Sequence, residues 1–296
     1  MSLKKSKKLF AAWISLISNF ILTIIKIIIG AAFHSTALVA DGVHNGGDVI
    51  ASIATLSSMK LSNQPADKEH PYGHGKAEDI ASGAISIILG LAGLFLIYES
   101  FMAFFEPAAS VSMWAFFAAI VSLIWKQLLY KYTIKIGRQA NSKSLIATAY
   151  DHLADVYASL AAVIGLGAGW IGDIFHIPYA VYGDPIAGIV VSFLIIKVAI
   201  EMGIKSINVL MESNVSEEKQ EHYRKLILTF PEVKRIDRLR AREHGNYILI
   251  DARLSVPGDL TIQEGHDITK TIRDRMMKKN KDVEEVLIHL NPWYPD

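Results

Sequence analysis

Two polar stretches lie within otherwise apolar sequence and carry side chains that could bind a metal ion. In the first, Asp41, Asn45 and Asp48 stand at i, i+4 and i+7, the spacing that places side chains above one another on one helix face. In the second, Asp151 and Asp155 stand about one helical turn apart. An uncompensated carboxylate inside a lipid bilayer costs about 2.5 kcal/mol or more. A divalent cation would compensate that cost, so the two stretches predict a metal site inside a membrane.

The expected ligands of this site offer oxygen only, and they are Asp41, Asn45, Asp151 and Asp155. Carboxylate and amide oxygens suit hard or borderline divalent cations, and the sequence contains no cysteine that could supply a thiolate. The alternative is that these residues only hydrogen bond one helix to another, but four at this spacing on two segments exceed that need. We therefore expect the two segments to hold one cation between them.

Four further polar residues stand near this set. His44 and His152 each adjoin an expected ligand in sequence, and one residue turns a helix by about 100°. We expect that rotation to aim both imidazoles away from the ion, so that each contacts a neighbouring helix or supports a ligand, with direct binding of the ion as the alternative. Asp48 extends the first polar face and could receive ions or protons, or could only line the cavity wall. Lys26 interrupts the first apolar run, and either snorkelling to the interface or pairing with a carboxylate would accommodate it.

A short polar segment between two apolar runs holds a second candidate site, formed by Asp67, His70 and His74. Pro71 and Gly73 bend this segment, so the three side chains can approach one another. Two imidazoles and one carboxylate suit Zn²⁺, Fe²⁺ or Mn²⁺. A solvated polar loop that binds no metal is an equally good interpretation.

The C-terminal part scatters four potential metal ligands over separate elements: Asp237, Asp251, His266 and His289. Asp251 and His289 lie on predicted strands and could converge with residues of a neighbouring copy. Each of the four is also unexceptional as a surface residue. Metal binding and a plain surface role therefore both stay open.

The polar stretches must be held by membrane helices, and the composition supports this. Hydrophobic residues make up 51% of the 296-residue chain, more than soluble domains contain even when glycine is counted with them. A helix needs about 20 mainly apolar residues to cross a bilayer. Six segments approach that length: residues 10–32, 37–59, 80–104, 113–134, 145–170 and 180–206. The first is too long for the apolar core of a signal peptide, so we interpret it as a membrane helix.

Positive charge is distributed unevenly between the connecting segments. Residues 31–37, 105–113 and 170–179 contain neither lysine nor arginine. The other side carries basic residues, namely Lys4, Lys5, Lys7, Lys8, Lys60, Lys68, Lys76, Lys131, Lys135, Arg138 and Lys143. This pattern follows the positive-inside rule and predicts a multi-pass protein of a cell membrane, with both termini in the cytoplasm.

The composition changes near residue 208, which predicts a transmembrane domain over residues 1–208 and a soluble domain over residues 209–296. The second domain has the pattern helix, strand, strand, helix, strand, at residues 213–230, 233–242, 247–256, 261–278 and 285–290, with a turn at Gly245-Asn246. This order is typical of a ferredoxin-like fold with both helices on one sheet face. The expected fold class is a membrane all-α six-helix bundle followed by a cytoplasmic α/β ferredoxin-like domain, whose open sheet face could pair with a second copy.

Taken together, the chain resembles the cation diffusion facilitator family over nearly its whole length. The resemblance rests on six spans, the two polar segments, the loop His-Pro-Tyr-Gly-His-Gly-Lys at residues 70–76 and the ferredoxin-like tail. Members of that family are homodimeric, proton-coupled exporters of divalent transition metals. The resemblance assigns the four oxygen ligands to the transport site, the loop trio to a loop site and the four tail residues to regulatory metal binding. It also implies a charged pair, Lys76 with Glu212, that locks the dimer near the membrane surface.

Departures from the family pattern bear on which metal is carried. Zinc members have histidine on the fifth helix where this chain has Asp151, and many members have aspartate at the position of Asn45. Loss of imidazole disfavours Zn²⁺, and an all-oxygen set favours Mn²⁺. In the tail, Asn291 stands where an acid is common, and Asp237 and Asp251 stand where imidazoles are common. The number of metal ions bound by the tail therefore stays open.

The sequence thus predicts a proton-coupled Mn²⁺ exporter that works by alternating access, with Zn²⁺ or Fe²⁺ as alternative cargo. No P-loop is present, so a gradient must supply the energy. An uncoupled metal channel is a further alternative. An intramembrane metallohydrolase would need a motif such as His-Glu-x-x-His, which the sequence lacks, so we expect neither an enzyme nor a permanent cofactor. The net charge of +1 gives no indication of nucleic-acid binding.

Overall fold

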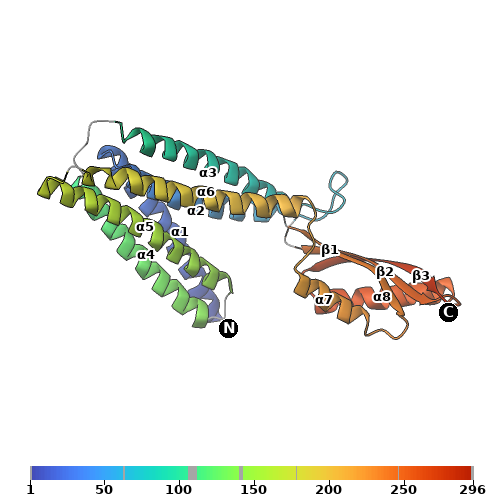
Figure 1. Cartoon of the computed structure of the whole chain (residues 1–296). Helices are drawn as coiled ribbons and strands as arrows, with labels where there is room; N and C mark the ends of the chain where they lie inside the picture. Colours follow the sequence, from blue (N-terminus) through green and yellow to red (C-terminus); the bar gives the residue numbers. More distant parts are fainter. Residues whose placement is uncertain are drawn as a thin grey trace. The chain divides into compact units, whose positions relative to one another are not determined.

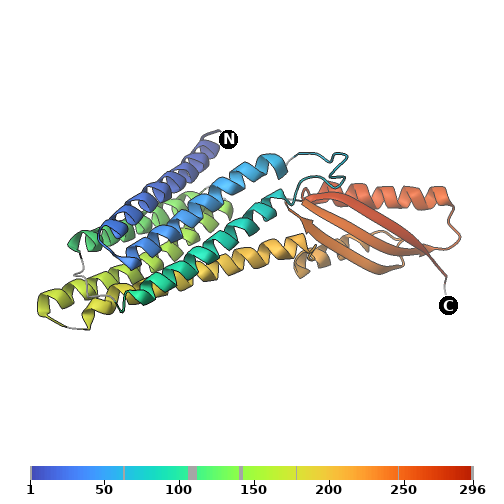
Figure 2. The same cartoon turned by 90° about the horizontal axis from the view of Figure 1, so that it is seen from above.

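Six long helices occupy the N-terminal two thirds of the chain in the computed structural model, which describes residues 2–62, 64–105, 112–139, 143–177, 179–245 and 247–294. They are α1 (Ser2–Ala32), α2 (Thr36–Ser62), α3 (Ala77–Met102), α4 (Met113–Gln139), α5 (Lys143–Phe175) and α6 (Gly183–Leu210) (Figures 1 and 2). The chain divides into two compact units. The first holds the residues up to Ala54 together with Ala84–Gly203, and the second holds Thr55–Gly83 and the residues from Ile204 onward.

Five of these helices are long and apolar enough to cross a membrane within the described ranges, and α2 is the exception. It is as long as α4, at 27 residues, but its polar side chains lower its mean hydropathy. The helical bundle expected from sequence is confirmed, with helix ends that differ by several residues. The polar character of α2 is the feature that separates it from the other five.

The first unit is held together by α2, which packs on two sides. On one side Ala40 of α2 is buried with Leu89 of α3 and Ile195 of α6. On another side Leu38 is buried with residues of α4 and α5, including Leu166. Figures 1 and 2 show α3 and α6 running side by side, and α4 and α5 doing the same. Because helices lie on both of its sides, α2 has little free surface on which its polar residues could face solvent.

Close contact between α1 and α2 depends on Gly42. A Cβ atom at this position would come within 2.8 Å of Ile27 and 3.0 Å of Lys26 Cβ. Glycine is the residue that allows helix backbones to approach this closely in a membrane. The approach brings Lys26 of α1 next to the polar stretch of α2.

The second unit contains α7 (Glu217–Ile227), β1 (Arg235–His244), β2 (Tyr247–Pro257), α8 (Ile262–Lys279) and β3 (Val283–Trp293). The sheet order is β1-β2-β3, with β1 antiparallel and β3 parallel to β2. The predicted order of helices and strands is therefore confirmed. Gly245 has a φ of +68°, as expected for a tight turn, while Asn246 lies outside the described residues.

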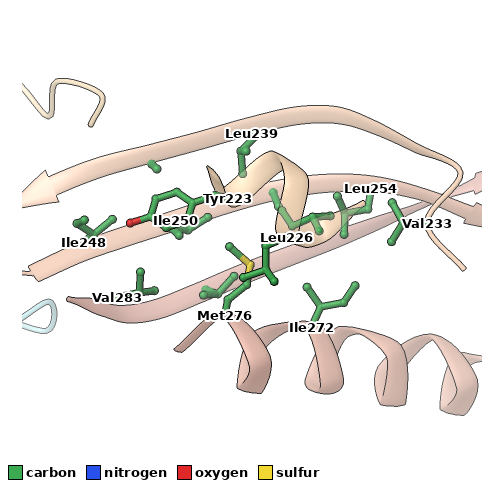
Figure 3. Packing of buried hydrophobic residues seen from close by; sticks show 14 of the residues in the cluster. Tyr223, Leu226, Val233, Leu239, Ile248, Ile250, Leu254, Ile272, Met276 and Val283 are labelled. Carbon is green, nitrogen blue, oxygen red and sulfur yellow. The ribbon is translucent and has the colours of Figure 1, made fainter. Parts of the chain in front are cut away.

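Both helices of this unit cover one face of the sheet (Figure 3). Tyr223 of α7 and Met276 of α8 point toward Ile250 and Leu254 of β2, and all four are at most 2% exposed. Arg238 and Arg253, at positions that alternate with the buried ones, are exposed. The opposite face is therefore exposed around Arg238 and Arg253 in a single copy. The predicted domain boundary at residues 208 and 209 stays a prediction, and α6 continues past it to Leu210.

Candidate metal centre

Asp41 of α2 is a fully buried carboxylate on which three helices converge. The Nζ atom of Lys26 on α1 lies 2.7 Å from Asp41 Oδ2. Ser159 Oγ on α5 donates a hydrogen bond to the same oxygen at 2.8 Å. The other oxygen, Oδ1, has no hydrogen-bond partner among the described residues. Asp41 Oδ2 is therefore bonded within the protein, whereas the buried Oδ1 is available to a ligand.

Asp155 of α5 lies one turn before Ser159 and is also buried. Its Oδ2 pairs with the ammonium of Lys126 on α4. Its Oδ1 lies 3.2 Å from His44 Nε2 on α2. Possible ligand atoms of His44, Asp48 and Asp155 all lie within 4.8 Å of one another. The polar stretches of α2 and α5 therefore face each other inside the bundle.

The four residues expected as ligands do not share one environment. Asp41, Asn45 and Asp155 are buried, at no more than 2% exposure, whereas Asp151 is exposed. Neither amide atom of Asn45 has a hydrogen-bond partner in the described part of the chain. A buried amide without partners is costly, and an ion bound to its oxygen would satisfy it. The structure groups Asp155 with His44 and Asp48 rather than with Asp151, and the assignment of metal ligands stays a prediction.

His44 makes the expected contact with a neighbouring helix, but that contact lies at the centre. Its imidazole faces Asp155 rather than pointing away from the centre. The reason is that α2 has neighbours on more than one side, so a turn of 100° still leads to α5. His152 does make the expected helix contact, because its Nε2 lies 2.9 Å from Ser15 Oγ on α1. Its Nδ1 is nevertheless only 3.6 Å from Asp155 Oδ2.

Two lysines complete the charge arrangement of the centre. Of the two possibilities for Lys26, pairing with a carboxylate is the one the structure contains. Lys126 was not expected at the centre from sequence. The signal was available, because Lys126 lies well inside the apolar segment 113–134, and a charged side chain at such a position indicates an interior role.

The loop trio comes together as its spacing predicted. Asp67 Oδ1 is 3.4 Å from His70 Nδ1, and Asp67 Oδ2 is 3.4 Å from His74 Nε2. The backbone N–H of His70, followed by that of Glu69, donates to Asp67 Oδ1 and lowers the pKa of this carboxyl. An ionised carboxylate beside two imidazoles can bind a divalent cation. Metal binding by this loop stays a prediction.

Glu212, just after α6, joins the loop to the tail within the second unit. Its Oε1 lies 3.3 Å from Lys76 Nζ, and its Oε2 lies 3.2 Å from Arg242 Nη1. Partial burial raises the pKa of Glu212, but the hydrogen bond from Lys76 and the charge of Arg242 outweigh it and hold the pKa below its ordinary value. The expected pair of Lys76 and Glu212 is thus present within one copy, and its role in a dimer stays a prediction.

The four tail residues do not form a metal cluster within one copy of the described chain. Asp237 is engaged by hydrogen bonds from Asn291, Ser255 and Arg235, which lower the pKa of its carboxyl. Asp251 lies 3.5 Å from Arg242 Nη1. His266 lies on α8 and His289 on β3. Convergence of these residues with a neighbouring copy stays a prediction.

Comparison with known proteins identifies the family. Residues 12–211 match the family model described as the cation efflux transmembrane domain, and residues 215–293 match the cytoplasmic domain of cation efflux proteins. The chain belongs to the cation efflux family. These are the cation diffusion facilitators, so the resemblance noted from sequence is confirmed. The protein is accordingly a multi-pass membrane transporter of metal cations.

Relatives match this cation efflux protein along nearly its whole length. The manganese efflux system protein MneP of Bacillus subtilis is 45% identical over 96% of both chains. The manganese efflux system protein MneS of the same organism is 31% identical, over 98% of this chain and 97% of that one. The magnetosome protein MamB of a Magnetospira species is 32% identical, over 95% of this chain and 94% of that one.

Proposed function

We propose that this chain exports Mn²⁺ from the cytoplasm in exchange for protons. The observation that carries the proposal is the meeting of α2 and α5 at buried oxygen ligands, among them Asp41, Asn45 and Asp155. Carboxylate and amide oxygens are donors that Mn²⁺ accepts readily. The identity with a manganese efflux protein over 96% of both chains supports the same cargo.

The ion is held between the two helices and passes from one side of the membrane to the other as the helices rearrange. Asp151 is exposed and stands one turn from Asp155 on the same helix, so we assign it the role of receiving the ion first. Asp41, Asn45 and Asp155 then hold the ion in the interior. Protons arriving from the outer side neutralise the carboxylates and release the ion, which couples export to the proton gradient.

His44 supports a second candidate cargo. Its Nε2 lies beside Asp155 Oδ1, so one imidazole nitrogen can join the oxygen ligands. Imidazole suits Zn²⁺ and Fe²⁺. Either ion is therefore the alternative cargo of the same transporter.

We also propose the orientation and the assembly of the protein. The distribution of lysine and arginine supports a cytoplasmic location of both termini, with a transmembrane domain over residues 1–208 and a cytoplasmic domain over residues 209–296. The open sheet face of the second unit would pair with a second copy to give a homodimer. No permanent cofactor is required, since metal ions and protons are cargo.

The direct test is transport by the purified chain in proteoliposomes. We expect Mn²⁺ flux to exceed Zn²⁺ and Fe²⁺ flux and to rise several-fold when an opposing proton gradient is imposed. A Mn²⁺ flux that does not change when the proton gradient is imposed would instead indicate an uncoupled channel. Asp155→Asn should abolish transport, and the matched control Glu201→Gln should not, because Glu201 on α6 has a side chain that is 65% exposed. Normal Mn²⁺ export by Asp155→Asn would contradict the assigned site.

A further inference from the structure

Two lysines inside the helical bundle hold the two carboxylates that the proposed transport site uses. Lys26 of α1 and Lys126 of α4 are both 0% exposed. Each places its ammonium on the Oδ2 atom of one carboxylate, Lys26 on Asp41 and Lys126 on Asp155. One oxygen of each carboxylate is therefore already occupied by a positive charge that belongs to the protein.

A lysine ammonium and a divalent cation meet the same need at a buried carboxylate. Both compensate its charge, and both bind its oxygen atoms. They also repel each other, and this repulsion is strong where water is excluded. A metal ion that takes both oxygens of Asp41 or Asp155 must displace the lysine. The ion and the lysine therefore compete for one position.

Each lysine has a neutral oxygen to which it is already bonded. Lys126 Nζ donates to Asn19 Oδ1 at 2.8 Å, and Lys26 Nζ donates to Ser159 Oγ at 3.2 Å. A buried ammonium keeps part of its stabilisation if a hydrogen bond remains. Each lysine can thus leave its carboxylate and still keep one hydrogen bond inside the bundle.

The same centre also contains two oxygen atoms that the lysines do not contact. Asp41 Oδ1 and Asn45 Oδ1 have no hydrogen-bond partner within the described ranges. An arriving cation can bind these atoms first and then compete for the occupied ones. The contacts of Lys26 and Lys126 are therefore placed to act in the later part of binding and in release.

We propose that Lys26 and Lys126 are tethered cations that compete with the exported metal ion for Asp41 and Asp155. The inference rests on the proposed function and extends it to two residues outside the ligand set. Competition lowers the affinity of the site for the metal. After the ion has left and the carboxylates have given up their protons to the cytoplasm, each lysine returns to its carboxylate, so the empty site keeps its charge balance.

The test measures Mn²⁺ binding by the full chain in lipid nanodiscs. Titration calorimetry gives the affinity, and thermal unfolding is compared between samples with saturating Mn²⁺ and samples without Mn²⁺. The variants are Lys126→Gln and Lys26→Gln. The control is Lys197→Gln on α6, which removes the same charge from a side chain that is 71% exposed. We expect each buried-site variant to bind Mn²⁺ about tenfold more tightly than wild type, and the Tm to rise more on Mn²⁺ addition. The control should match wild type in both measurements.

A purely structural ion pair predicts different results. If wild type binds Mn²⁺ normally and both variants bind it with unchanged or weaker affinity, the lysines do not compete with the metal ion. That result would leave the proposed function intact. A variant that folds only with Mn²⁺ supports the proposal, because the metal then replaces the missing charge, whereas one that Mn²⁺ does not rescue counts against it. Wild-type protein that binds no Mn²⁺ would overturn the proposed function and this inference together.

Discussion

Residues of several helices surround the Asp155 carboxylate and set its environment. His44 of α2, Lys126 of α4 and His152 of its own helix all have a nitrogen within 3.6 Å of its carboxylate. Such contacts are what a buried charge requires. Asp151 stands one turn away and is exposed. Two acids that look equivalent in the sequence therefore differ in environment, and we assign them different roles in transport.

Asn45 allows a ligand role to be separated from a structural role. Its buried amide has no hydrogen-bond partner among the described residues, so Asn45→Leu removes no hydrogen bond of the amide. We expect the Tm without metal to hold or rise, while Mn²⁺ affinity falls by about tenfold or more. Thermal unfolding and calorimetric titration measure the two effects. A lower Tm with unchanged affinity would assign Asn45 to packing alone.

The residues of the centre differ in how far sequence could reveal them. Asp41, Asn45 and Asp155 stand out because polar side chains are rare in apolar spans. The contact of His44 with Asp155 could not be predicted, because helical angles give directions around one axis and do not say which neighbour lies there. Lys126 was overlooked, and its partner is 29 positions away in sequence, a pairing that only the packing of α4 on α5 creates.

At the scale of elements, the start of α2 is fixed by a residue of α6. Asp184 accepts hydrogen bonds from the backbone N–H groups of Thr36 at 2.9 Å and Ala37 at 3.2 Å, and from Ser35 Oγ at 2.7 Å. The first N–H groups of a helix have no partner within it. Asp184 therefore caps α2 from a distance of almost 150 residues, and it anchors the helix that carries Asp41.

Removal of this cap should loosen α2. Asp184→Ala leaves the backbone donors at the start of α2 without an acceptor, and loss of a cap costs about 0.5–2 kcal/mol. We expect a lower Tm and weaker Mn²⁺ transport, with a smaller loss for Asp184→Asn, which keeps one acceptor oxygen. Thermal unfolding of wild type and the two variants measures the three Tm values. Equal stability of all three proteins would show that the cap is unimportant.

Element ends were harder to predict than element types. The last strand was expected at residues 285–290, whereas β3 spans Val283–Trp293. The longer strand includes Pro292, and β3 lies at the edge of the sheet, where a strand tolerates proline. The first helix of the tail was expected at residues 213–230, yet α7 spans Glu217–Ile227. Ser216 caps it by accepting a hydrogen bond from the backbone N–H of Lys219, so the helix begins after Ser216.

For the whole molecule, fold class and family were accessible from the sequence because independent features agreed. Apolar segment lengths indicated the bundle, alternation of apolar residues indicated the sheet, and the loop at residues 70–76 linked both to one family. The matches over residues 12–211 and 215–293 confirm that family. The pairing of lysines with the transport carboxylates was not accessible, since it depends on how four helices pack together.

In the proposed transporter, α2 and α5 hold one metal ion between them. Anomalous scattering at the manganese absorption edge, from crystals of the full chain grown with Mn²⁺, tests it most directly. We expect a manganese peak bound by Asp41 and Asp155, with Asn45 in contact. Peaks confined to Asp67, His70 and His74 or to the tail, with none between α2 and α5, would contradict it.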